Sequence, residues 1–129
     1  MKLSFKTYRI ECTHPFGISR SSHNYYDIIY IYLDHEGLLG RGEAAPSGRY
    51  NEFTKDILTL LEDGIELPSE IEDPELFSDS ISKQCKGIKA LEVAFSMATL
   101  DWWCQKHSIP IYEYFGGNPE NAPKTSYTI

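Results

Sequence analysis

The chain has 129 residues, of which 41% are hydrophobic and 24% are charged, and its formal net charge is -7. This composition is typical of one globular domain and excludes a fibrous or disordered chain. The excess of acidic side chains argues against nucleic acid and anionic membranes as partners, because both would repel the chain. No segment has the roughly 18 apolar residues of a membrane span. The first residues also lack the basic and then apolar order of a signal peptide, so we expect a cytoplasmic protein.

The three cysteines, Cys12, Cys85 and Cys104, are odd in number and lie far apart in the sequence. They lack the CxxC pairing of zinc and redox sites. We therefore interpret them as reduced thiols, most of them buried, rather than as metal ligands or nucleophiles.

The first third of the chain has the pattern of β structure. Side chains alternate over residues 2–9, and the segment 24–33 is rich in tyrosine and isoleucine, which favour a pleated surface. Residues 34–37 have the composition of a tight turn, with glycine where a positive φ is needed, and residues 38–45 resume as a third strand. This order predicts an antiparallel meander of three strands.

From residue 51 onward the apolar residues recur at helical spacing. The pattern predicts a first helix between the N-cap Asn51 and residue 64, and a second helix that follows Pro74. A third helix is predicted over about residues 87–107, and a last turn or two over residues 111–115. The chain therefore reads as strands followed by helices.

The third predicted helix has an unusually wide apolar face. Placed at about 100° per residue, its apolar side chains cover an arc of about 220°, whereas one packing partner needs only about 100°. The sheet is expected to cover one side, and the other side is expected to face either a partner outside this chain or the two shorter helices. Asp101 lies within the apolar arc, so its carboxylate needs a partner, and we interpret it as structural.

Three blocks of sequence together resemble the muconate-lactonizing subgroup of the enolase superfamily, and most closely its dipeptide epimerases. The first block follows the third strand and is similar to the G-x-G-E-x-x-P motif of the subgroup. The second resembles the long helix of the subgroup and its continuation, and the last resembles the first strand of the catalytic barrel. The blocks are GRGEAAP at 40–46, ALEVA at 90–94 with LD at 100–101, Lys106, IPIY at 109–112 and FGG at 115–117, and TSYTI at 125–129.

The resemblance implies an α+β capping domain over residues 1–124, in which a three-stranded antiparallel meander precedes a helical bundle. Residues 125–129 would begin the (β/α) barrel, which needs roughly 250 residues and is therefore expected outside this chain. In the family, lysines move a proton α to a carboxylate, and Mg²⁺ bound by three acidic residues stabilises the enediolate. These residues would lie beyond Ile129. The chain alone is thus expected to hold no catalytic residue and no metal ligand.

The resemblance also implies that two loops contact the substrate, a dipeptide or another carboxylate. The first loop covers residues 16–23 and carries the candidates Ile18 and Arg20, and the second covers residues 46–50 and carries Tyr50. Epimerases that act on alanyl-glutamate place an arginine in the first loop, where its guanidinium pairs with the acidic side chain. Thr128 would point into the barrel. The expected partners are the substrate, the barrel and further copies of the protein.

Several alternatives remain open at this point. Within the superfamily they are an o-succinylbenzoate synthase, a cycloisomerase and an N-acyl amino acid racemase, and from another class a free-standing α+β binding module. Other polar and aromatic residues that resemble site residues are interpreted as surface, packing or interface residues. They are His14, His23, Glu43, Trp102 and Trp103.

Overall fold

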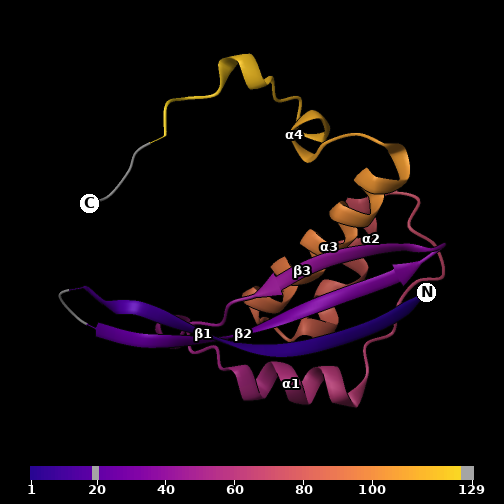
Figure 1. Cartoon of the computed structure of the whole chain (residues 1–129). Helices are drawn as coiled ribbons and strands as arrows, with labels where there is room; N and C mark the ends of the chain where they lie inside the picture. The colour runs from indigo at the N-terminus through magenta and orange to yellow at the C-terminus, as the bar shows by residue number, and fades with distance from the viewer. Residues whose placement is uncertain (19–20, 126–129) are drawn as a thin grey trace.

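The computed structural model describes residues 1–18 and 21–125, and of these it describes every side chain except those of residues 15–18 and 21–23. Three antiparallel strands form one sheet in the order β1-β2-β3. Strand β1 spans Lys2–Ile18, β2 spans Ser21–His35 and β3 spans Leu38–Ala44 (Figure 1). The helices follow the strands in the chain. The predicted α+β class is therefore confirmed.

The turn between β2 and β3 lies where the sequence predicts it. His35 pairs with Leu38, and the two residues between them, Glu36 and Gly37, have φ values of 51° and 77°. Two successive positive φ angles match the twist of the strands that such a turn joins. Glycine adopts this conformation without strain, which explains its place at the end of the turn.

The hairpin of β1 and β2 is longer than predicted. The expected loop over residues 16–23 is wrong for most of its length, because Phe16 pairs with His23, Gly17 with Ser22 and Ile18 with Ser21. The register shifts between Glu11 and Phe16. Glycine and serine have low strand propensity, but main-chain pairing with a neighbouring strand outweighs this local preference.

Four α-helices and three 3₁₀ turns are found among the described residues, and the predicted order of helices is confirmed. The prediction that Asn51 is the N-cap of the first helix is wrong. Asn51 has a left-handed φ of 58° and ends a 3₁₀ turn, and α1 begins only after Phe53. Asparagine tolerates this conformation, so the turn uses it before the helix starts. The helices are α1 Thr54–Asp63, α2 Pro74–Ser82, α3 Lys89–His107 and α4 Ile111–Tyr114, and the 3₁₀ turns are η1 Gly48–Tyr50, η2 Lys83–Cys85 and η3 Pro119–Asn121.

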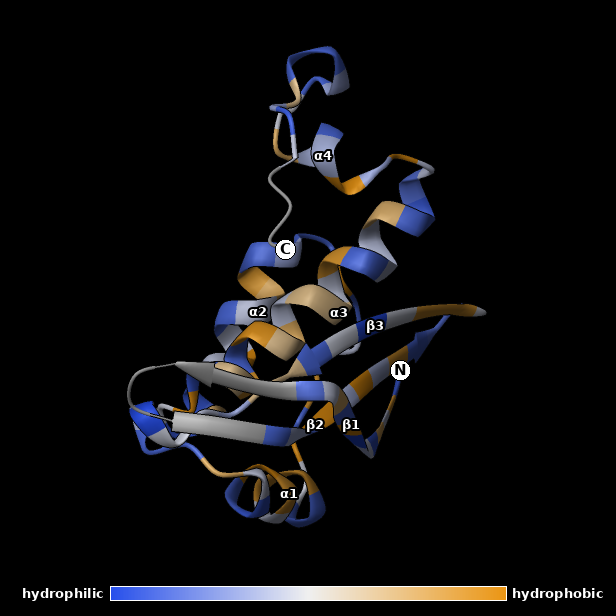
Figure 2. Cartoon of the chain, turned by 60° about the vertical axis from the view of Figure 1, so that its left-hand side comes forward, coloured by the Kyte–Doolittle hydropathy of each residue, from blue (hydrophilic) through white to orange (hydrophobic). Residues whose placement is uncertain are grey.

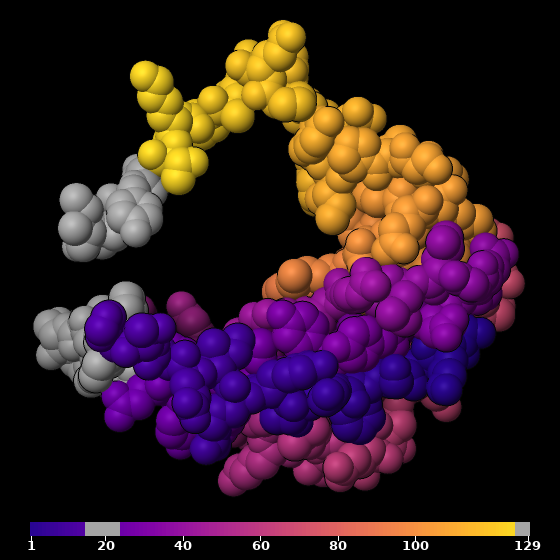
Figure 3. All heavy atoms as spheres, in the orientation of Figure 1, coloured from indigo at the N-terminus to yellow at the C-terminus, as the bar shows by residue number. Residues whose placement is uncertain are grey.

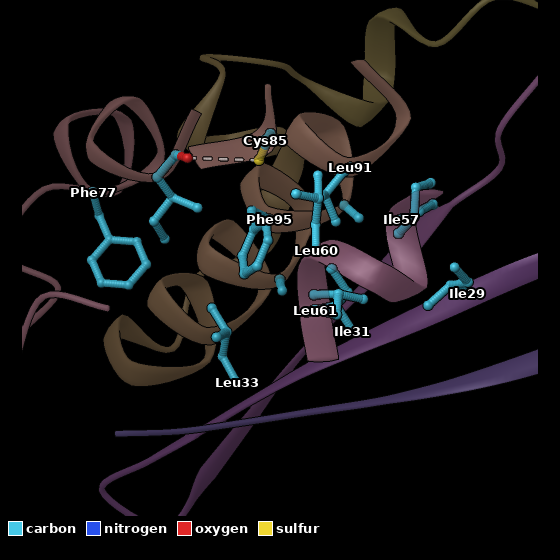
Figure 4. Packing of buried hydrophobic residues seen from close by; sticks show 14 of the residues in the cluster. Ile29, Ile31, Leu33, Ile57, Leu60, Leu61, Phe77, Cys85, Leu91 and Phe95 are labelled. Atoms are coloured by element: carbon cyan, nitrogen blue, oxygen red, sulfur yellow. Dashed lines mark hydrogen bonds between the residues drawn. The ribbon is translucent and has the colours of Figure 1, made fainter. Parts of the chain in front are cut away.

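The core lies on one face of the sheet. Alternate side chains of β2, Ile29, Ile31 and Leu33, are completely buried. They pack against apolar residues of α1 and α3, which include Leu61 and Phe95 (Figure 4). On the opposite face the ring of Tyr30 contacts those of Tyr8 and Tyr32, and Figure 2 shows the strands coloured by hydropathy. The sheet therefore buries one face under helices, as a period of two predicts.

Strand β3 lies unusually close to α3. A Cβ atom on Gly40 would overlap the carbonyl oxygen of Ala98, and one on Gly42 would overlap that of Ala94. Two glycines on one face of the strand thus meet two alanines one helical turn apart. The G-x-G of the 40–46 block is required here because any side chain would separate the two backbones.

Helix α2 covers a second side of α3 through buried residues that include Phe77 and Ile81. The expectation that the shorter helices cover the wide apolar arc is therefore correct in part. Val93 and Met97, one turn apart on α3, nevertheless remain 52% and 46% exposed. Beyond α3 the chain runs away from the body of the molecule through α4 and η3 (Figure 1).

Candidate functional site

The segment that follows β3 forms a compact loop closed by its own hydrogen bonds. The Ser47 carbonyl accepts from the backbone N–H of Tyr50 at 2.9 Å and from that of Glu52 at 3.2 Å, and Asn51 N–H donates to the Gly48 carbonyl at 3.1 Å. Tyr50 is the last residue of η1, and it is 70% exposed. The loop therefore presents a large aromatic side chain to solvent from a backbone that is held at both ends.

Glu52 connects this loop to the start of α3. The residue is only 8% exposed, and its Oε1 atom accepts from the backbone N–H groups of Lys89 at 2.6 Å and Ala90 at 3.4 Å. The N-cap residue of α3 is Ile88, whose apolar side chain cannot accept a hydrogen bond from these N–H groups. The first N–H groups of a helix lack partners within the helix and attract negative charge, so a carboxylate stabilises this end. Sequence reasoning missed Glu52, although the absence of a polar residue at Ile88 signalled that α3 needed a distant cap.

An open hollow of about 290 Å³ lies between the loop, the end of β3 and the first turn of α3. Its lining combines the exposed side chains of Tyr50 and Val93 with the charged residues Glu52 and Lys89. Figure 3 shows a much wider hollow between the body and the C-terminal segment, and the orange residues of α3 and α4 form part of its inner side. The exposed apolar residues of α3, of α4 and of the residue after α4 are Val93, Met97, Ile111, Tyr112 and Phe115.

The predicted substrate-binding residues are described to different extents. Arg20 and Thr128 lie outside the described residues. Ile18 ends β1 and pairs with Ser21, and its side chain also lies outside the described part. Tyr50 lies beside the hollow as an exposed residue of the second loop. The contacts predicted between these residues and a substrate therefore stay predictions.

Asp101 has a structural partner, as its position in the apolar arc predicts. Its Oδ2 atom accepts from the backbone N–H of Arg41 at 2.8 Å, and one turn later Gln105 donates to the carbonyl of Leu39 at 3.0 Å. The four residues from Asp101 to Gln105 advance about 6 Å along the helix, and the two residues from Leu39 to Arg41 advance about 6.6 Å along the strand. The spacing of the two side chains therefore matches that of the two backbone groups. Helix α3 thus satisfies the polar groups along the outer edge of β3.

Of the remaining polar and aromatic candidates, Glu43, Trp102 and Trp103 contact other residues of the chain, whereas His14 is exposed and the side chain of His23 lies outside the described part. A hydrogen bond with Glu43 raises the pKa of the Tyr30 phenol, because the nearby carboxylate disfavours a phenolate. Trp102 is completely buried and donates to the His35 carbonyl at 2.8 Å. Trp103 is half-buried, and the centroid of its ring lies 4.0 Å from the centroid of the His107 ring. Both tryptophans therefore pack within the chain.

Each of the three cysteines is a free thiol. Burial raises the pKa of the Cys85 thiol to about 11 and also raises the pKa of the Cys104 thiol. A thiol with so high a pKa is protonated at neutral pH and is a poor nucleophile or ligand. The expectation that most of the cysteines are buried is confirmed for Cys85 and Cys104, and Cys12 is half-buried.

One group of possible metal ligands occurs within the described part of the chain, and it does not suit magnesium. His35, Glu36 and Glu70 place their ligand atoms within 4.8 Å of one another. The Glu36 carboxylate already pairs with the Lys106 ammonium at 2.8 Å, and Glu70 contacts the His35 ring at 3.3 Å. Magnesium prefers six oxygen ligands in octahedral geometry, and this group offers a ring nitrogen beside a cation.

No protein-family model matches the sequence. The whole chain is, however, 33% identical to an L-Ala-D/L-amino acid epimerase of Maribacter sp., of which it covers 39%. It is 26% identical to an L-Ala-D/L-Glu epimerase of Bacteroides thetaiotaomicron, of which it covers 34%. The whole chain is therefore homologous to part of these epimerases. It thus spans little more than a third of the length of these curated relatives.

The fold matches part of solved dipeptide epimerase structures. A dipeptide epimerase from Cytophaga hutchinsonii, complexed with Mg and the dipeptide D-Ala-L-Val, superposes on 97% of this chain with a TM-score of 0.82 and 20% identity, and the match covers 35% of that protein. The resemblance predicted from the three sequence blocks is confirmed. In the part of the chain that the structure describes, no helix has the length and apolar character needed to cross a bilayer.

Proposed function

We propose that this chain is the capping domain of a dipeptide epimerase, and that its loops select the substrate while the catalytic barrel is supplied by further sequence. The main support is the extent of the homology, which covers the whole chain but only 39% of the Maribacter relative. That relative is an L-Ala-D/L-amino acid epimerase, which leaves the remaining 61% for other parts of the enzyme. The boundary at residue 124, with residues 125–129 opening the barrel, belongs to this proposal.

The exposed apolar residues of α3 support a missing neighbour. Val93 and Met97 are about half exposed although they lie on the longest helix of the core, and Phe115 beyond α4 is 70% exposed. Exposed apolar surface of this kind is typical of an interface. We propose that the barrel covers these exposed apolar residues and also faces the hollow beside Tyr50.

Arg20, Ile18, Tyr50 and Thr128 are the proposed substrate contacts. Arg20 would pair with an acidic side chain of the dipeptide, since a guanidinium matches both oxygens of a carboxylate. One relative is an L-Ala-D/L-Glu epimerase, which supports an acidic second residue. A magnesium ion in the barrel would stabilise charge on the substrate. Because the group at His35 does not suit this ion, we propose that its ligands lie outside this chain. A homo-oligomeric, cytoplasmic enzyme remains the prediction from the sequence.

The first experiment separates the capping domain from a free-standing binding module. The 129-residue chain and the full-length protein are incubated with L-Ala-L-Glu in D₂O, and exchange of the α-proton is followed by NMR. We expect exchange with the full-length protein only. Turnover by the 129-residue chain above a buffer control would refute the proposal, and so would a gene that ends at Ile129.

The second experiment tests Arg20 in the full-length enzyme. Arg20→Ala should lower kcat/KM for L-Ala-L-Glu by roughly 30-fold to 1000-fold, because an ion pair shielded from water contributes about 2–4 kcal/mol. L-Ala-L-Ala should change little. Arg41→Ala removes the same charge from an exposed position of β3 and is the control. Equal losses on both dipeptides would assign Arg20 to the fold or to loop closure.

A further inference from the structure

We propose that Glu52 is a positioning residue that fixes the loop of residues 47–52, and with it Tyr50, beside the start of α3. The inference rests on the proposed function, in which this loop faces the substrate. It adds a residue whose bonds to α3 determine where a substrate-contacting residue lies.

The side chain of Glu52 is committed to α3. It is 8% exposed, and one carboxylate oxygen accepts from the N–H groups of both Lys89 and Ala90, at 2.6 Å and 3.4 Å. The Lys89 ammonium pairs instead with Glu92 at 2.7 Å. The carboxylate of Glu52 is therefore held by the helix terminus, and a neutral acceptor of the same shape would be held there as well.

The backbone of the same residue closes the loop. Glu52 N–H donates to the Ser47 carbonyl at 3.2 Å, and Tyr50 N–H donates to the same oxygen at 2.9 Å. One residue thus joins the two ends of the loop and attaches them to a helix 37 positions further along the chain. Without the side-chain contact, the loop would keep its internal turn but lose its attachment to α3.

The position of this loop decides the shape of the hollow. Tyr50 and Ser47 line it on one side, and Lys89, Ala90 and Val93 line it on the other. A shift of the loop relative to α3 would move Tyr50 away from Val93 and widen the hollow. Substrate binding should weaken as a result, whereas proton transfer in the barrel should change little.

The test compares Glu52→Ala with Glu52→Gln in the full-length protein. Gln keeps the accepting oxygen, and Ala removes it. For Glu52→Ala we expect amide hydrogen exchange in residues 47–52 to be about 10-fold faster, KM for L-Ala-L-Glu to rise on the order of 10-fold and kcat to stay within about 3-fold. Glu52→Gln should remain close to the unmodified protein in all three measurements.

The chain offers a matched control for the loss of a helix cap. Asp73 caps α2 through bonds to the N–H groups of Glu75 and Leu76 at 2.8 Å and 2.9 Å, and it lies outside the proposed site. Asp73→Ala and Glu52→Ala should each lower Tm by an amount on the order of 5 °C, because each removes a helix cap. Asp73→Ala should nevertheless leave hydrogen exchange in residues 47–52 and the KM unchanged.

Two results would overturn the inference: equal effects of Glu52→Ala and Asp73→Ala on exchange and KM, or a Glu52→Gln variant as impaired as Glu52→Ala. If the unmodified full-length protein turned over no dipeptide, the proposed function would fail. Hydrogen exchange in residues 47–52 would then still decide whether Glu52 fixes the loop.

Discussion

At the scale of single residues, buried and half-buried carboxylates in this chain bind backbone N–H groups. Asp101 bonds to the edge of β3, and Glu52 bonds to the end of α3. In both cases the carboxylate accepts from a backbone N–H that has no partner within the donor's own strand or helix. Removing the Glu52 acceptor leaves a part-buried N–H without its partner, which costs more than the net contribution of an average hydrogen bond.

Asp101 provides a direct test. Asp101→Ala should lower the free energy of unfolding by about 1–2 kcal/mol, because Arg41 N–H loses a charged acceptor in a half-buried setting. Asp101→Asn keeps an acceptor and should cost less than half of this. Urea denaturation of the purified chain followed by circular dichroism measures both, and Glu62→Ala removes an exposed carboxylate of α1 as the control. A loss for Asp101→Ala no larger than that control would show that the bond contributes nothing to stability.

At the scale of elements, the contact of β3 with α3 organises the domain. Glycines at 40 and 42 face alanines at 98 and 94, so strand and helix meet backbone to backbone. The polar bonds from Asp101 and Gln105 run along the same interface and fix how far the strand can slide. Close packing and edge bonding therefore determine one register between strand and helix.

Gly42→Ala should be among the most damaging small substitutions in the chain. Its Cβ would overlap the Ala94 carbonyl, which is backbone and cannot rotate away, so we expect a loss of about 3 kcal/mol in the free energy of unfolding. Gly48→Ala is the matched control, because the nearest atom to its Cβ would be in the Phe53 ring at 4.0 Å. That variant should lie within about 0.5 kcal/mol of the unmodified chain. Thermal unfolding of both variants measures the difference, and similar stabilities would contradict the close approach.

At the scale of the whole molecule, the distribution of exposed apolar residues is uneven. Val93 and Met97 lie on the helix that otherwise forms the centre of the core, and Ile111, Tyr112 and Phe115 are further exposed apolar residues beyond this helix. The proposed barrel would cover these residues in the complete enzyme. In the isolated chain they have only solvent or another copy to contact.

We expect the isolated 129-residue chain to self-associate through this part of α3. Met97→Lys should raise the apparent Kd of association roughly 10-fold or more, since a charge would have to lose its hydration at the contact. Leu76→Lys is the control, because it also replaces an exposed apolar side chain by a charged one, at a residue of α2 that is 71% exposed. It should have little effect on the Kd of association. Sedimentation velocity over a range of concentrations measures both. An unmodified chain that stays monomeric throughout would count against an uncovered interface.

The sequence by itself determined the local elements and the homology. The turn at Glu36 and Gly37, the three strands and the long helix all follow from patterns within short windows, where the chemistry of each residue acts on its neighbours. The three motif blocks were also sufficient to indicate the enolase superfamily. The candidates Arg20 and Thr128 came from that resemblance and stay predictions, because they lie outside the described residues.

Tertiary structure decided the features that depend on distant parts of the chain. Residues 16–18 and 21–23 pair as strands despite their glycine and serines, because each strand supplies the other with hydrogen bonds that composition cannot reveal. Asn51 ends a 3₁₀ turn rather than capping α1, and the cap of α3 comes from Glu52, which accepts from the N–H of Lys89, 37 residues further along the chain. Periodicity encodes which face of an element is apolar, but it carries no information about which distant residue will satisfy the unpaired groups at that element's end.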